Sequence, residues 1–174
     1  MDTENRNDWY KAAEKWEVDF VDRFGKQLGI IINPSKKVDK CAPDLYILKG
    51  SIVADLKVQR TPFFKSEKEY NIPPQYCWTF NVSDLFDYSV RYSDRLVILI
   101  WVKYDQDLED YGVKVAAEES IYATSLFNLK KLILDEGKVH HYIRRGNDTN
   151  GNAYGSHTLD LRRIKKLETK CNKI

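Results

Sequence analysis

The chain has 174 residues, of which 43% are hydrophobic and 13% aromatic, and its formal net charge is +2. This length and composition predict one globular domain with its own core, and exclude a disordered chain or two full-sized domains. No apolar run approaches the ~20 residues of a membrane-spanning helix, which argues against a membrane partner.

The cysteines and the first residues indicate the compartment. Cys41, Cys77 and Cys171 are odd in number and widely spaced, which fits a reducing environment better than a disulfide framework or a zinc site. The first residues also lack the basic start and apolar segment of a signal peptide. We therefore expect a cytoplasmic protein.

The chain is expected to begin with an amphipathic helix over residues 7–28. Its apolar side chains recur at steps of three and four residues, and Gly29 stands where a helix commonly ends. Further on, residues 44–49 and 51–59 alternate as two paired strands joined by a turn near Gly50.

The rest of the chain mixes strands, loops and helices. Residues 95–103 form the clearest strand, apolar on both faces, and Ser125 is expected to cap a helix over residues 126–135 that Gly137 ends. The other expected elements are strands at 30–32, 77–82, 121–123, 140–145 and 157–161, a helix at 84–92 capped by Ser83, and loops at 33–35, 60–76, 104–119 and 146–155.

This order of elements predicts an α/β (α+β) protein with a mixed central sheet flanked by helices. We expect residues 1–174 to form a single domain. Residues 138–174 would be a basic strand-and-loop extension of that domain at its C-terminus.

The predicted hairpin gathers charged residues on one face. Because side chains alternate along a strand, either register around Gly50 places even positions of the first strand beside odd positions of the second. One face is then wholly apolar, made of Leu45, Ile47, Ile52, Ala54, Leu56 and Val58. The opposite face carries Asp44, Asp55, Lys57 and Gln59, together with Tyr46, Leu48 and Val53.

Two neighbouring carboxylates suggest a cation site, because they repel each other unless positive charge lies between them. Mg²⁺ prefers oxygen ligands, and the backbone carbonyl of Leu56 is a third candidate beside Asp44 and Asp55. Such a metal activates water and neutralises charge on a phosphodiester, while Lys57 could orient that water or stabilise the phosphate. The alternative is a cross-strand salt bridge between Lys57 and one of the acids.

The first helix offers a third acid. Glu17 follows Ala13 by four residues and precedes Phe20 by three, so it lies near the apolar stripe. A carboxylate turned toward the core is unfavourable unless it meets a cation, which makes Glu17 a candidate site residue. A side chain that reaches back to solvent explains the position equally well.

Pro43-Asp44, ten intervening residues and Asp55-Leu56-Lys57 resemble the PD-(D/E)xK signature of restriction-endonuclease-like nucleases. The expected α-β-β-β-α-β order up to residue 135 is similar to the core of that superfamily. The resemblance implies a Mg²⁺-dependent phosphodiesterase, with Mn²⁺ able to substitute, in which Asp44 and Asp55 bind metal and Glu17 is the helix acid. It also implies that Lys57 positions or deprotonates the attacking water, and that Gln59 is the polar residue that often follows the lysine.

Basic residues near the motif and in the C-terminal quarter predict contacts with nucleic acid. From residue 138 onward there are nine Lys or Arg residues and three acids, although a merely solvated surface explains this excess about equally well. The expected phosphate contacts are Arg60, Lys65, Arg144, Arg145, Arg162 and Arg163. The chain has no G-x-x-x-x-G-K-[ST] motif, so no nucleotide cofactor is expected.

Together these features predict a Mg²⁺-dependent nuclease that acts on DNA, most simply as an endonuclease, with RNA left open as a substrate. Cleavage of both strands would need a homodimer or two successive nicks. Two other classes remain: a nucleic-acid-binding protein that does not cleave, and a structural or interaction module whose acids are only salt-bridged. The concentration of acids where phosphate must approach favours cleavage.

Overall fold

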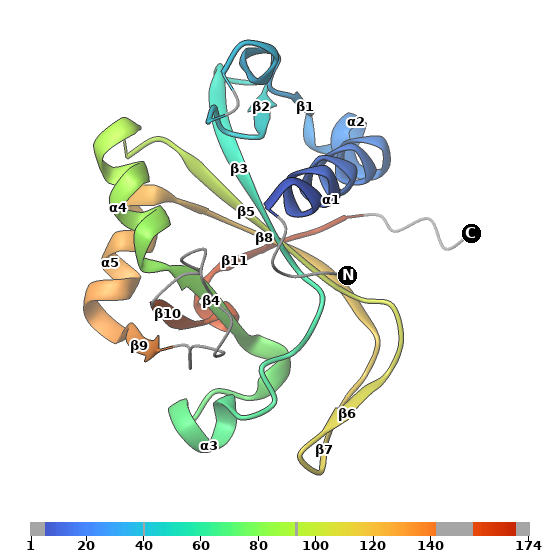
Figure 1. The fold of residues 1–174 in the computed structure, drawn as a ribbon, viewed down its shortest axis with the longest axis vertical. Coiled ribbons are helices and arrows are strands. Elements are labelled where there is room, and N and C mark those ends of the chain that lie inside the picture. The colour runs from blue at the N-terminus through green and yellow to red at the C-terminus, as the bar shows by residue number, and fades with distance from the viewer. Residues whose placement is uncertain (1–5, 40, 93, 142–154, 170–174) are drawn as a thin grey trace.

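The computed structural model describes residues 6–39, 41–92, 94–141 and 155–169, and shows an α/β protein with a six-stranded mixed sheet plus helices (Figure 1). Only β3 and β5 run parallel, and each other neighbouring pair in this sheet is antiparallel. In spatial order the strands are β1 (Ile30–Ile32), β2 (Leu45–Ile47), β3 (Ile52–Gln59), β5 (Val97–Tyr104), β8 (Glu118–Ser125) and β11 (Lys165–Leu167).

A long N-terminal helix covers one face of the sheet (Figure 1). It consists of α1 (Arg6–Phe20), a π-helical turn (Val21–Gly25) and α2 (Lys26–Leu28), and it ends at Gly29, whose φ of 66° suits glycine. The predicted helix and its stop are therefore confirmed. The buried residues under this helix are Phe20, Phe24, Ile30, Leu45, Ala54, Leu56, Leu99, Trp101 and Ile121.

The opposite face is covered by α4 (Val82–Arg91), α5 (Leu126–Glu136) and a small antiparallel sheet. That sheet has the order β4 (Cys77–Asn81), β10 (Gly155–Asp160) and β9 (Lys138–His141). Alternate residues of β5 enter the two cores, with Ile98 and Ile100 on this side and Leu99 and Trp101 on the other. The prediction that this strand is buried on both faces is confirmed.

Two helices have N-caps that were predicted from the sequence. Ser125 caps α5 as expected, and its side chain accepts a hydrogen bond from the backbone N–H of Asn128. The prediction of Ser83 as the cap of α4 is wrong, because the helix begins earlier and Asn81 occupies the cap position. None of the helices among the described residues is long and apolar enough to cross a membrane.

Two stretches expected to be loops contain short elements. The first includes α3 (Ser66–Tyr70), which ends at Asn71 in the left-handed conformation. The second contains a hairpin of β6 (Leu108–Asp110) and β7 (Val113–Val115), whose turn has positive φ at both Tyr111 and Gly112. Such turns match the twist of paired strands, and here they permit a hairpin in a segment whose acidic composition had suggested a loop.

The C-terminal elements depend on distant pairing. Strand β11 was not predicted, because its three residues have no alternation and it forms by pairing with β8. The predicted strand at 140–145 begins earlier in the structure, as β9, and residues 142–145 lie outside the described part of the chain.

Candidate active site

The hairpin of β2 and β3 adopts one of the two registers considered from the sequence. Leu45 pairs with Ala54 and Ile47 with Ile52, so the next step of the ladder places Asp44 opposite Asp55. Leu45, Ala54 and Leu56 are buried beneath the N-terminal helix, as the apolar alternation predicted. Asp55 is therefore directed toward the opposite face, which α4 covers.

The two strands separate at Asp44. Beyond this point β3 has no strand partner on the β2 side within the described part of the chain, and the backbone N–H of Leu56 donates instead to Oδ2 of Asp44 at 3.1 Å. Because the N–H and C=O of a strand residue point to the same side, the carbonyl of Leu56 faces the same gap. The gap therefore holds a carboxylate and a carbonyl oxygen.

Lys36 joins Glu17 to Asp44. Glu17 is only 6% exposed, and the Nζ atom of Lys36 lies 2.6 Å from each of its carboxylate oxygens and 2.6 Å from Oδ1 of Asp44. The structure thus turns Glu17 inward and brings it close to Asp44. The ammonium group of Lys36 therefore lies between the two acids.

A short turn positions Lys36. It belongs to the 3-10 turn Pro34–Lys37, in which the backbone N–H of Ser35 donates to the side chain of Asn33 at 3.0 Å. The amide of the same buried Asn33 donates to the carbonyl of Pro43 at 2.8 Å, which ties the turn to the start of β2. The sequence analysis did not single out Lys36, and a lysine after Pro34-Ser35 has no local pattern that would mark it.

Asp55 and Lys57 form the second part of the site. Oδ2 of Asp55 is buried and accepts no hydrogen bond from any described residue, although Nζ of Lys57 lies 3.2 Å away. Lys57 donates instead to Oδ2 of Asp84 at 2.7 Å and to the hydroxyl of Tyr88 at 3.0 Å. Asp84 and Tyr88 belong to α4. Neither was predicted as a site residue, because each contacts Lys57 only through the tertiary packing of α4 against β3.

The pKa values reflect this crowding of acids. Burial, reinforced by Asp44, raises the pKa of Glu17 to about 7 even though Lys36 acts in the opposite direction. Burial also raises the pKa of Asp55 to about 6, with Lys57 opposing and Asp44 adding to the effect. In both residues burial is the main cause, and the neighbouring carboxylate of Asp44 adds to it.

Lys57 behaves differently. Burial disfavours its ammonium form, but the carboxylates of Asp55 and Asp84 and the hydrogen bond to Asp84 hold the pKa of Lys57 well above the usual lysine value. Lys57 is therefore a fixed positive charge and a hydrogen-bond donor. In this arrangement Lys57 suits orienting a water molecule or a phosphate better than accepting a proton near neutral pH.

The cluster contains more carboxylates than ammonium groups. Four carboxylates (Glu17, Asp44, Asp55 and Asp84) surround two ammonium groups (Lys36 and Lys57), which leaves an excess of two negative charges when all are ionised. Among the described residues, no three His, Cys, Asp or Glu side chains are grouped closely enough to hold a metal. Binding of a cation by Glu17 and Asp44 together therefore requires Lys36 to move.

Gln59 has other partners. Its amide nitrogen donates to the carbonyl of Cys77 at 3.0 Å and to the hydroxyl of Tyr104 at 2.9 Å. These contacts link β3 to β4 and β5 beyond the Asp55–Lys57 pair. The hydrogen bonds of Gln59 therefore tie neighbouring strands together, and they are not made to Glu17, Asp44, Asp55 or Asp84.

The predicted phosphate contacts are spread over the molecule. Arg60 lies 3.3 Å from Asp105 and stacks over Trp16, and Lys65 stacks over Tyr111. Arg162 binds the carboxylate of Asp160, and Arg163 pairs with Glu136. Arg144 and Arg145 lie outside the described residues.

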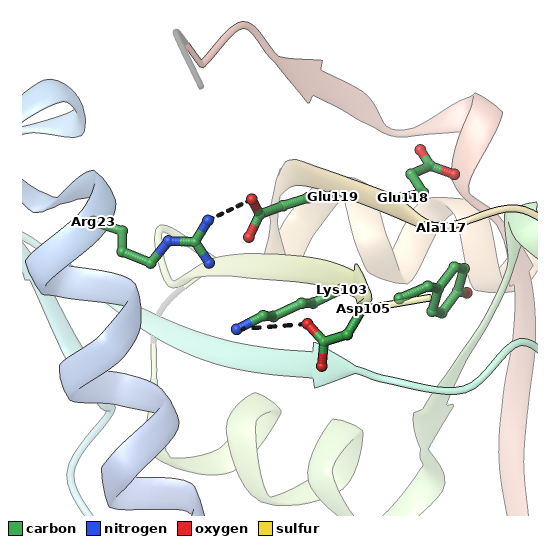
Figure 2. Close-up of a pocket in the computed structure, with 7 residues that line it drawn as sticks. Arg23, Lys103, Asp105, Ala117, Glu118 and Glu119 are labelled. Carbon is green, nitrogen blue, oxygen red and sulfur yellow. Dashed lines mark hydrogen bonds and ion pairs between the residues drawn. The ribbon is translucent and has the colours of Figure 1, made fainter. Parts of the chain in front are cut away.

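A groove of about 430 Å³ lies apart from this cluster (Figure 2). It contains none of the predicted catalytic residues, and Figure 2 shows Arg23 reaching from the helix toward Glu119 while Lys103 faces Asp105. Its two cations are paired with acids, and three acids line it in all, so the groove presents no excess positive charge for a phosphate. The lining residues are Arg23, Lys103, Tyr104, Asp105, Ala117, Glu118 and Glu119.

Comparison of the chain with protein-family models, with curated proteins and with solved structures finds no significant match. The α/β architecture alone does not identify a function, because similar architectures carry many chemistries. Function must therefore be inferred from the site formed by Glu17, Lys36, Asp44, Asp55 and Lys57.

Proposed function

We propose that this protein is a divalent-cation-dependent nuclease that cleaves DNA. The observation that carries the proposal is the juxtaposition of Asp44 and Asp55 where β2 separates from β3, with the Lys57 ammonium 3.2 Å from Asp55. Phosphodiester hydrolysis needs such a combination, because acids can hold a cation while a lysine stabilises charge on phosphate.

The order of elements supports a restriction-endonuclease-like fold. An N-terminal helix is followed by the antiparallel strands β1, β2 and β3. Helix α3 and strand β4 come next, before α4 and then β5, which runs parallel to β3. With α3 and β4 set aside, this is the α-β-β-β-α-β order that the PD-(D/E)xK resemblance implied. The site lies on the second and third of these strands, as that resemblance also implied.

The donor atoms suit a hard cation such as Mg²⁺ or Mn²⁺. Asp44, Asp55 and the Leu56 carbonyl offer only oxygen, and the buried Oδ2 of Asp55 accepts no hydrogen bond from the described residues. These three residues would hold the ion, with Glu17 close to Asp44. When bound, the ion would supply an activated water and neutralise developing charge on the phosphate.

The protein's own residues then have separate tasks. Lys57, kept charged by Asp55 and Asp84, would donate a hydrogen bond to a phosphate oxygen or hold the attacking water in line. Asp44 and Asp55 cannot carry out this task because they repel phosphate. Arg60 lies just beyond the end of β3 and is half exposed. Among the predicted phosphate contacts, it is the closest to the site in the sequence.

The test is a cleavage assay with the full chain on supercoiled, linear and single-stranded DNA and on RNA, with Mg²⁺, Mn²⁺ or EDTA. We expect nicking of circular DNA that requires the divalent ion and is lost in Lys57→Ala and Asp55→Asn. Asp87→Asn is the matched control, because Asp87 is an exposed acid on α4. Absence of metal-dependent cleavage of every nucleic acid would refute the proposal.

One observation favours a second candidate, a structural or interaction module. Lys36 and Lys57 already lie within ion-pair distance of Glu17, Asp44, Asp55 and Asp84. Titration calorimetry separates the two functions, because a salt-bridged module should bind neither Mn²⁺ nor DNA. A binding protein that does not cleave would bind DNA equally well after Asp55→Asn.

A further inference from the structure

Helix α4 contributes a carboxylate and a phenol to the proposed site. We propose that Asp84 and Tyr88 are positioning residues that fix the Lys57 ammonium beside the proposed cation site. This inference rests on the proposed nuclease function. It adds two residues that lie outside the PD-(D/E)xK pattern, 27 and 31 positions after Lys57.

Lys57 contacts its three partners in different ways. Its ammonium donates to Asp84 at 2.7 Å and to Tyr88 at 3.0 Å, whereas the 3.2 Å approach to Asp55 is an ion pair without a hydrogen bond. The same ammonium lies 5.2 Å from the centre of the Tyr88 ring and 5.8 Å from that of Phe80. A lysine has a flexible four-carbon stem, so these contacts define where its charge is located.

The helix delivers both groups together. Residues four apart lie on the same face of an α-helix, so Asp84 and Tyr88 project toward the same part of β3. Tyr88 and Leu85 pack against the buried core, which sets the position of α4. We call Asp84 and Tyr88 the lysine clamp. The clamp is held in place by the same core that buries β5.

Asp84 also keeps Lys57 from closing on Asp55. If Asp84 were absent, Asp55 would be the remaining carboxylate within 3.2 Å of the ammonium, and the lysine would be drawn to it. Oδ2 of Asp55 would then be engaged by Lys57 and less able to bind a cation. The clamp thus leaves Oδ2 of Asp55 without a hydrogen bond from Lys57, and it leaves one of the three ammonium N–H groups for a phosphate oxygen.

Steady-state cleavage by Asp84→Asn, Asp84→Glu and Tyr88→Phe tests the clamp. We expect kcat to fall by about tenfold or more in Asp84→Asn and by less in Tyr88→Phe, with KM for DNA changed by less than about threefold. Asp84→Glu, which restores the carboxylate, should recover most of the rate. Asp87→Asn should resemble wild type.

A second readout does not need cleavage. In ¹⁵N NMR of the full chain, the hydrogen-bonded Lys57 ammonium should give a cross-peak protected from water exchange, which Lys57→Ala assigns. Asp84→Asn should abolish this peak while the backbone spectrum stays folded. An unchanged peak together with an unchanged kcat in Asp84→Asn would overturn the clamp, whereas a wild type that never cleaves would overturn only the proposed function.

Discussion

The carboxylate of Asp44 takes the place of a neighbouring strand for Leu56, accepting its backbone N–H at 3.1 Å where β2 and β3 separate. One side chain thus completes the hydrogen bonding of the sheet and stands in the gap where a cation would bind. Its structural and chemical roles can be separated by substitution.

Asp44→Asn and Asp44→Ala should differ in stability but agree in cation binding. The asparagine oxygen can still accept from Leu56, whereas alanine leaves that N–H unpaired and should lower the free energy of unfolding by about 1 kcal/mol more. Both changes remove a negative ligand and should abolish Mn²⁺ binding. Urea unfolding and titration calorimetry check the two effects, and equal Mn²⁺ affinity in wild type and Asp44→Asn would contradict the assigned ligand.

Lys36→Met should tighten cation binding. The substitution removes the ammonium that lies between Glu17 and Asp44, so a divalent ion no longer competes with it and meets one more uncompensated negative charge. We expect Mn²⁺ affinity to rise by about tenfold, which corresponds to about 1.4 kcal/mol, and unfolding without metal to become easier. Calorimetry on Lys37→Met, at an exposed neighbour in the same turn, is the control.

Stability without divalent ions should fall as the pH rises. The pKa of Glu17 (about 7) and that of Asp55 (about 6) exceed the ordinary values of 4.5 and 3.8, so the folded state binds these protons more tightly than the unfolded chain. Their favourable contribution is therefore complete below about pH 4 and is lost as the pH rises through 6 and 7.

Melting temperatures in EDTA between about pH 5 and about pH 8 measure this effect. Glu17→Gln should lose less stability over that interval than wild type, because it lacks one of the two titrating groups. Mg²⁺ should raise the melting temperature more at the higher pH, where both carboxylates are ionised. If the melting temperature fell equally with pH in wild type and in Glu17→Gln, Glu17 would not be a source of the pH dependence.

Gly25→Ala should disturb the helix that carries Glu17. A Cβ atom at Gly25 would lie 2.7 Å from the carbonyl oxygen of Ile30, so the π-helical turn would have to move away from β1. We expect a loss of more than about 2 kcal/mol of unfolding free energy. Gly29→Ala has open space around it and only a positive φ of 66°, so it should cost about 1 kcal/mol.

Some of the site follows from local patterns. The alternation of apolar residues in the hairpin predicts which face carries Asp44, Asp55 and Lys57, because the two-residue repeat of a strand leaves no other choice. The three- and four-residue spacing of the first helix places Glu17 beside the apolar stripe but leaves a solvent-directed side chain equally open. The structure confirms the hairpin face and shows that Glu17 is buried.

The partners of these residues depend on contacts between distant segments. Lys36 reaches Glu17 across 19 positions, and Asp84 reaches Lys57 across 27, so no local spacing relates them. Strand β11 likewise exists only because β8 offers an edge to pair with.

The sequence by itself therefore determined which residues share a face of the hairpin and of the first helix, since periodicity is a property of the local backbone. Only the tertiary structure decided that two lysines divide the four acids between them, because packing of the turn Pro34–Lys37 and of α4 sets where those ammonium groups lie. That division places the Lys36 ammonium between Glu17 and Asp44, and it holds Lys57 as a charged hydrogen-bond donor between Asp55 and Asp84.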